Sequence, residues 1–278
     1  MTVPATLVPQ SSIVAAAARL TLAQETGVPC VAVRDLIGAD DVLSAYAVQQ
    51  EITAARLAAG AVVVGRKIGL TSEAVQRQMG VAQPDFGILF DDMVFADGGT
   101  IPRGFVLQPR VEAEIAFVLD KDLADGPLDI DQVRGAIAYA AAAIEVCGSR
   151  IAQWDISFGD TVADNASSGA YVLGGIRRTL DEFDPVAAQM HMTVTGAEDS
   201  VGTGVASLGD PLNAVTWLAR QARELGEPLR AGQVVLSGAL GPMRAVTPGA
   251  EVRVSVTGLG TVSVRFEEDV DAVEQQGE

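Results

Sequence analysis

The first 60 residues repeat apolar positions at the three- and four-residue spacing of helices. Two segments follow this spacing, the alanine-rich 12–27 and then 41–60, which Asp40 or Asp41 can cap. From residue 62 the pattern changes to β-branched runs separated by glycine and proline, which is typical of strands. The pattern therefore predicts a helical N-terminal part followed by a β-rich part.

Six β-branched runs are expected to form strands, and the last of them reads as a hairpin that turns near residues 258–260. They cover 61–70, 104–120, 166–175, 189–196, 232–241 and 250–266.

Helical spacing returns only in 130–145 and in 211–226, so strands and helices do not alternate regularly. An α+β fold is expected rather than a doubly wound or barrel-type parallel sheet. The expected organisation is a helical region at 1–61, a β-rich catalytic domain at 62–268 and a frayed tail at 269–278.

Composition narrows the classes of partner. Basic and acidic residues give a net charge of −17 without any basic block, which disfavours nucleic acid and anionic membranes as partners. No apolar stretch is long enough for a membrane helix, and the N-terminus lacks the pattern of a secretion signal. The two distant cysteines, Cys30 and Cys147, suit a reducing compartment, and the expected location is the cytoplasm.

A single histidine, His191, excludes any site built on several histidines in one chain. It lies in a strand-like run without a neighbouring serine or cysteine motif, so we interpret it as structural. Chemistry must then come from carboxylates, lysine, hydroxyl groups, backbone amides or a metal.

Two glutamates, Glu112 and Glu114, lie one residue apart at the start of an apolar run. Alternation along a strand places them on one face, where bulk water, a cation or a shared proton must relieve their repulsion. A third glutamate, Glu145, ends the alanine-rich segment 130–145, which reads as a helix. Three carboxylates without histidine would form a hard oxygen site that suits magnesium or manganese, provided that the fold brings Glu145 to the other two.

Two further ionisable residues are candidates for the site. Lys67 lies in an apolar strand between glycines, where it either reaches solvent or occupies a cavity. Asp85 follows a proline at the start of an apolar segment, where turn formation is the simpler explanation. The polar run 154–171 reads as a loop, and it also carries enough hydrogen-bonding groups to line a pocket.

Seven motifs in order resemble the 2-hydroxypenta-2,4-dienoate hydratases of the fumarylacetoacetate hydrolase superfamily, over about residues 10–267. They are GRKIGLTS, QPDFGILFDDM, LQPRVEAEIAFVL, IEVCGSRI, DTVADNASSGAYVLGG, LGDPLNAVTWLA and SGALGPM. One departure is Ser168, where the family pattern has a small thiol, and this departure bears on substrate preference.

The resemblance implies a divalent metal, magnesium or manganese, on Glu112, Glu114 and Glu145. It also implies that Lys67 and Asp85 are active-site groups, and we expect the two to carry out the proton transfers, with the division between them left open. Contacts to the carboxylate end of the substrate are expected from Ser168 and from the backbone amides of Gly238, Ala239 and Leu240.

The implied reaction is the addition of water to a 2-hydroxy-2,4-dienoate in the meta-cleavage breakdown of aromatic rings or sterols, giving a 4-hydroxy-2-oxoalkanoate. The related 2-oxo-3-hexenedioate decarboxylases share the metal glutamates and are the nearest alternative, although the GALGPM segment favours a hydratase. A carbon–carbon hydrolase is disfavoured by the position of His191, and a non-catalytic partner-binding subunit by the intact site residues. The resemblance also implies a homo-oligomer, a pentamer or decamer, and association with a pathway neighbour.

Overall fold

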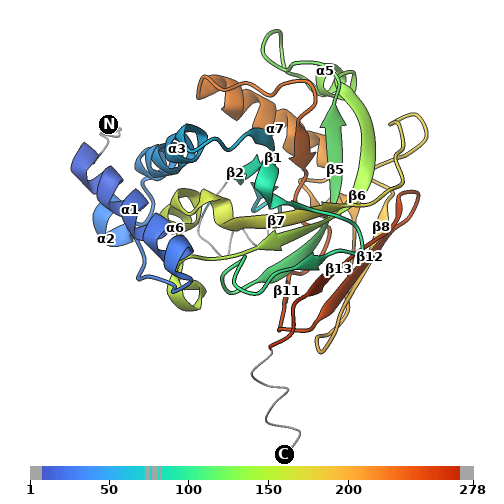
Figure 1. Ribbon diagram of the computed structural model, residues 1–278. Helices are drawn as coiled ribbons and strands as arrows, with labels where there is room; N and C mark the ends of the chain where they lie inside the picture. The colour runs from blue at the N-terminus through green and yellow to red at the C-terminus, as the bar shows by residue number, and fades with distance from the viewer. Residues whose placement is uncertain (1–7, 73–75, 77–80, 82, 270–278) are drawn as a thin grey trace, which may run out of the picture.

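The computed structural model describes residues 8–72, 76, 81 and 83–269 of the 278-residue chain (Figure 1). Three helices open it: α1 (Gln10–Thr26), α2 (Arg34–Ile37) and α3 (Val42–Ala58). The side chain of Asp41 accepts a hydrogen bond from the amide of Ser44, and it therefore caps α3 as one of the two expected candidates. None of the helices in these ranges combines the length and apolar character that crossing a bilayer requires.

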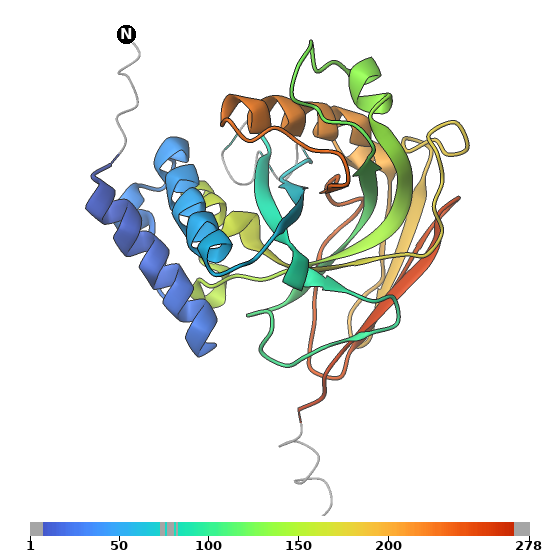
Figure 2. The same ribbon diagram turned by 45° about the horizontal axis from the view of Figure 1, so that its top comes forward.

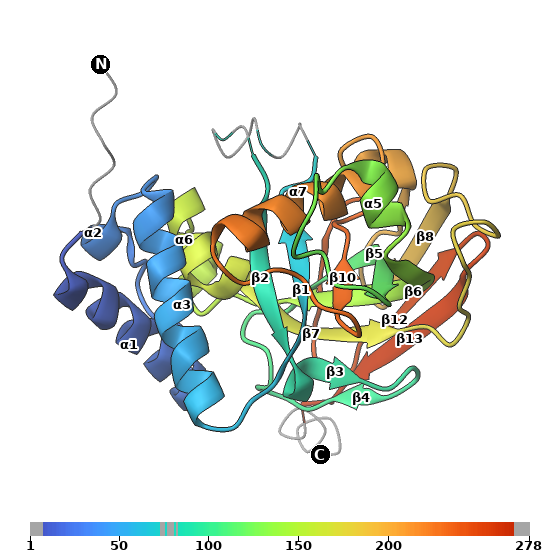
Figure 3. The same cartoon turned by 90° about the horizontal axis from the view of Figure 1, so that it is seen from above.

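Two sheets make up the β-rich part (Figure 3). Along the main path of the larger sheet the order is β2, β1, β10, β5, β6, β7 and β3, and β11 pairs with β5. Its strands are β1 (Val63–Gly69), β2 (Asp85–Phe90), β3 (Val94–Phe95), β5 (Arg110–Leu119), β6 (Ile137–Cys147), β7 (Ser168–Leu173), β10 (Val234–Leu236) and β11 (Arg244–Ala245).

The second sheet runs in the order β4, β13, β12, β8 and β9. Its strands are β4 (Thr100–Ile101), β8 (Gln189–Val194), β9 (Ser200–Thr203), β12 (Glu251–Val256) and β13 (Gly260–Phe266). Strands β12 and β13 pair antiparallel with Val256 opposite Gly260, which confirms the expected hairpin. Together with the N-terminal helices, the two sheets confirm the α+β prediction.

The prediction of one helix over 130–145 is wrong. Only α5 (Ile130–Arg134) is helical, and β6 replaces the rest of the expected helix. Although alanine favours helices, β6 hydrogen-bonds to β5 on one side and to β7 on the other. The alanines are almost all buried, and β12 and β13 of the second sheet pack against β6. The segment forms a strand because small side chains fit at the junction of the two sheets, and this packing outweighs the helical preference of alanine.

A second, smaller hydrophobic core fills the space between α1, α2, α3 and α6 (Phe158–Ala163), beside the sheets (Figures 1 and 2). Asp160, within α6, accepts hydrogen bonds from the amides of Val33 and Arg34 and so ties α6 to the start of α2. The helical layer therefore includes α6, which comes from the part of the chain expected to be β-rich. The boundary near residue 61 stays a prediction, and the expected tail lies outside the described residues from 270 onward.

The start of β2 is held between two helices. Phe86 stacks on Tyr46 of α3 and meets Trp217 of α7 (Pro211–Glu224) edge-on, with ring centroids 4.8 and 6.3 Å apart. The side chain of Gln49 donates to the backbone carbonyl of Phe86, and Asp210 caps α7 through the amide of Leu212. These contacts fix the backbone immediately after Asp85.

Candidate active site

The three predicted glutamates lie on two adjacent strands in the middle of the larger sheet. Glu112 of β5 is directly opposite Glu145 of β6, and Glu114 is opposite Ala143. Alternation along each strand places all three glutamates on one face. The structure thus brings Glu145 to the pair by strand register, although the helix that was expected to carry it is a strand.

These carboxylates are poorly satisfied by their own protein. Glu114 and Glu145 are both 0% exposed. Glu114 accepts one hydrogen bond, 2.7 Å from the amide of Gly238, while its other oxygen and both oxygens of Glu145 accept none from the described residues. Buried carboxylate oxygens without donors are costly unless a cation neutralises them. This donor set fits a hard divalent cation.

The pKa values of the glutamates also show that their charged forms are unfavourable in this site. Burial and the neighbouring charges of Glu145 and Glu112 raise the pKa of Glu114 well above its ordinary value. Burial, followed by the charge of Glu145, raises the pKa of Glu112 to about 7. Three like charges in one dry site are therefore unfavourable without a compensating positive charge.

Lys67 supplies one positive charge. It lies on β1, is 3% exposed, and places its Nζ 3.1 Å from Oε1 of Glu145. Burial alone would lower the pKa of Lys67, but the charge of Glu145 and its neighbours outweighs burial and raises that pKa well above its ordinary value. Of the two alternatives open from the sequence, the structure therefore selects the buried position over the solvent-exposed one.

Asp85 is the first residue of β2 and is also buried, opposite Gly69 of β1. A Cβ atom added at Gly69 would lie 2.2 Å from Oδ1 of Asp85 and 3.4 Å from Nζ of Lys67, so the glycine leaves the space in which these groups meet. Burial raises the pKa of Asp85 to about 6, against the opposing charge of Lys67. Asp85 thus lies beside Lys67 inside the protein, where turn formation does not explain it.

Ser168 and the segment 238–240 reach the edge of this cluster. Ser168 is buried opposite Cys147, and its Oγ has no hydrogen-bond partner among the described residues. The amide of Gly238 already donates to Glu114, and the amide of Leu240 to the carbonyl of Ala113. Contact of these groups, or of Ala239, with a substrate stays a prediction.

One residue near the carboxylates was missed from the sequence. Cys147 follows Glu145 by two positions on β6, and its Sγ lies 3.7 Å from Oε2 of Glu112. The signal was present as a Glu-x-Cys alternation, but it is meaningful only on a strand, and the segment that ends at Glu145 reads as a helix.

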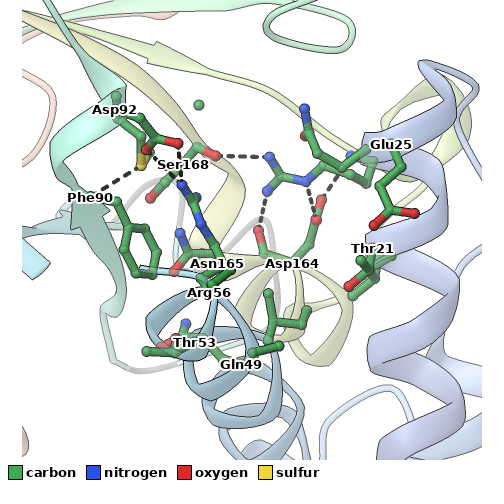
Figure 4. Close-up of a pocket in the computed structure, with 18 of the residues that line it drawn as sticks. Thr21, Glu25, Gln49, Thr53, Arg56, Phe90, Asp92, Asp164, Asn165 and Ser168 are labelled. Atoms are coloured by element: carbon green, nitrogen blue, oxygen red, sulfur yellow. Dashed lines mark hydrogen bonds and ion pairs between the residues drawn. The ribbon is translucent and has the colours of Figure 1, made fainter. Parts of the chain in front are cut away.

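A cavity lies between α1, α3 and the edge of the sheet (Figure 4). It measures about 580 Å³, and of the predicted site residues only Ser168 lines it. Its buried charges are paired, because Arg150 donates to the carboxylate of Asp164 and to the carbonyl of Ser168. The carboxylate cluster, whose buried oxygens lack hydrogen-bond partners among the described residues, is therefore the candidate site rather than this cavity.

The polar run 154–171 serves mainly structure, through the capping and ion-pair roles of Asp160 and Asp164. His191 lies on β8 of the other sheet, with its ring half exposed and Nε2 2.7 Å from Asp199. This position agrees with the structural interpretation of the histidine.

Comparison with known proteins gives the family. The family model described as the fumarylacetoacetate (FAA) hydrolase C-terminal domain matches residues 63–267. A TodF product hydratase of Pseudomonas putida F1 is 53% identical, with 88% of this chain and 91% of the relative covered. A 2-keto-4-pentenoate hydratase of Paraburkholderia xenovorans LB400 is 50% identical, with 91% of this chain and 94% of the relative covered.

A solved structure is similar throughout. The 4-oxalocrotonate decarboxylase from Pseudomonas putida G7, complexed with magnesium and adipate, matches with a TM-score of 0.88 at 34% identity. The match covers 93% of this chain and 98% of that one. The chain therefore belongs to the fumarylacetoacetate hydrolase family, in the group that contains the 2-keto-4-pentenoate hydratases.

Proposed function

We propose that this protein is a metal-dependent hydro-lyase that adds water to 2-hydroxypenta-2,4-dienoate, or to a longer 2-hydroxy-2,4-dienoate, giving a 4-hydroxy-2-oxoalkanoate. The observation that carries the proposal is the cluster of three glutamates, of which Glu114 and Glu145 are fully buried, beside the buried Lys67 and Asp85. It occurs in a chain about half identical to relatives named as hydratases. The expected setting is a meta-cleavage pathway.

Glu112, Glu114 and Glu145 would hold the divalent cation. Magnesium is supported by its presence in the related decarboxylase structure. A cation held there supplies positive charge that lowers the energy of enolate-like states of the substrate. The apolar part of β5 that follows the glutamates is buried, and it holds their backbone rigidly in the sheet.

Asp85 carries out the proton transfer, and Lys67 stabilises the charge that develops on the substrate. The pKa of about 6 lets Asp85 accept a proton near neutral pH and return it. It takes the proton of the 2-hydroxyl group and returns it to the fifth carbon, which gives the 2-oxo-3-enoate. Water then adds its hydroxyl group to the fourth carbon and a proton to the third. Lys67, whose raised pKa keeps it an ammonium, donates hydrogen bonds to the oxygen on which charge develops.

Decarboxylation of 2-oxo-3-hexenedioate is the nearest alternative, because the related decarboxylase has the same fold. One comparison favours hydration. The hydratase relatives are 50–53% identical to this chain, whereas the decarboxylase is 34% identical.

The substrate assay separates these reactions. With magnesium present, the protein is expected to remove the ultraviolet absorbance of fresh 2-hydroxypenta-2,4-dienoate and to form 4-hydroxy-2-oxopentanoate. Carbon dioxide release from 2-oxo-3-hexenedioate without hydration of the dienoate would make the protein a decarboxylase. Absence of both reactions in folded, magnesium-loaded protein would favour a non-catalytic subunit.

Asp85→Asn is expected to lower turnover roughly 10²-fold or more, because the amide preserves the shape of the side chain but cannot accept a proton. Stabilisation of the variant by magnesium, measured as the shift in Tm, is expected to persist. Asp92→Asn, at an exposed carboxylate paired with Arg56, is the matched control and should retain full turnover. Undiminished turnover in Asp85→Asn would remove Asp85 from the proton path.

A further inference from the structure

Cys147 faces the same side of the sheet as the glutamates. It is two residues beyond Glu145 on β6, so both side chains project from one face. The thiol is buried, at 1% exposure, and its Sγ lies 3.7 Å from Oε2 of Glu112. The other cysteine, Cys30, does not belong to this cluster, and its thiol donates a hydrogen bond to the carbonyl of Arg150.

The spacing of these atoms fits a metal ion. The ligand atoms of Glu112, Glu145 and Cys147 all lie within 4.8 Å of one another. In a tetrahedral zinc site, bonds of about 2.3 Å to sulfur and about 2.1 Å to oxygen place the two ligand atoms about 3.6 Å apart. The separation of 3.7 Å between Sγ of Cys147 and Oε2 of Glu112 is close to that value.

A second observation points to a ligand in the same place. Glu145 is fully buried, and neither of its oxygens accepts a hydrogen bond from the residues that the structure describes. The ammonium group of Lys67 lies 3.1 Å from Oε1 of Glu145 as an ion pair. The thiol of Cys147 donates a weak hydrogen bond to Oε2 of Glu112, and this bond leaves both oxygens of Glu145 without a hydrogen bond from the described residues.

We propose that Cys147 is a ligand for borderline divalent metals such as Co²⁺ and Zn²⁺, which bind through Glu112, Glu145 and Cys147. The inference rests on the proposed metal site and adds a sulfur donor to it. Sulfur favours these ions over magnesium, which is expected to bind the glutamate oxygens alone. The thiol gives its proton to solvent as the metal–sulfur bond forms. The site therefore discriminates among metals by the softness of one donor.

Cobalt provides a direct readout that does not depend on turnover. Metal-free protein titrated with Co²⁺ is expected to gain visible d–d bands together with a near-ultraviolet sulfur-to-cobalt charge-transfer band. Cys147→Ser should retain the visible bands and lose the near-ultraviolet band, whereas Cys30→Ser should retain both. In competition, Cys147→Ser is expected to lower the affinity for Zn²⁺ at least about 10-fold and to leave magnesium affinity unchanged.

The outcomes are separable. Visible cobalt bands without a near-ultraviolet band in the native protein would overturn the role of Cys147 and leave the carboxylate site standing. A near-ultraviolet band that persists in Cys147→Ser would overturn it as well. Absence of all cobalt bands from the folded native protein would overturn the carboxylate site together with the thiol proposal.

Discussion

Glu114→Gln is expected to lower magnesium-dependent turnover about 10³-fold, which corresponds to roughly 4 kcal/mol of transition-state stabilisation. The substituted amide can still accept the hydrogen bond that the Gly238 amide donates to Glu114, so the local backbone is retained. It cannot supply the negative charge that holds a divalent cation. The loss should therefore appear in metal binding and turnover rather than in folding.

Stability measurements distinguish this outcome from misfolding. Removal of one of the three neighbouring like charges is expected to leave the free energy of unfolding of the metal-free protein unchanged or higher. Magnesium at about 100 times its Kd should stabilise the native protein by about 2.7 kcal/mol, and this gain should shrink in the variant. Glu251→Gln, at a half-exposed glutamate on β12, is the charge-matched control. Native turnover and native magnesium stabilisation in Glu114→Gln would refute the metal assignment.

Asp164→Ala is expected to lower the free energy of unfolding by about 3–5 kcal/mol, because it leaves Arg150 buried without its carboxylate. Arg150 also donates from its backbone amide to Asp164, at 2.9 Å, and from its guanidinium to the carbonyl of Ser168, at 2.8 Å. These bonds join the segment after β6 to the end of α6 and the start of β7. Urea unfolding measures the loss.

Replacing both Arg150 and Asp164 tests whether the ion pair itself stabilises the protein or whether only the loss of one partner is costly. Burial raises the pKa of Asp164 even beside Arg150, which means that desolvation of the pair is costly. Replacement of both residues by apolar ones, Arg150→Met with Asp164→Leu, is therefore expected to recover most of the stability that either single change loses. Equal stability of Asp164→Ala and the native protein would show that the pair does not hold these segments together.

The sequence pattern was sufficient to predict those helices and strands whose tertiary contacts favour the same structure as the local sequence. Helices α1, α3 and α7 show helical spacing and have either their own caps or alanine-rich sequences. The β12–β13 hairpin alternates buried and exposed residues around its glycine turn. In these segments, side-chain pattern and backbone preference favour the same structure.

The segment 130–145 shows where such signals fail. Its alanines favour a helix in isolation, but burial on both faces and hydrogen bonds to β5 and β7 stabilise a strand. The same error concealed Cys147, since a residue two positions from Glu145 shares its face on a strand but not on a helix. The packing of α6 with the N-terminal helices also depends on contacts between residues more than 100 positions apart.

The sequence by itself determined which groups are available: three glutamates, a lysine and an aspartate in apolar surroundings, with one histidine outside the site. Alternation along a strand was enough to pair Glu112 with Glu114. Only the tertiary structure decided that Glu145 and Cys147 join them, because the register between β5 and β6 places Glu145 opposite Glu112. Packing of β1 and β2 likewise buries Lys67 and Asp85. Their pKa values are shifted as a result, because the pKa of a side chain depends on the solvent and charges around it in the folded protein.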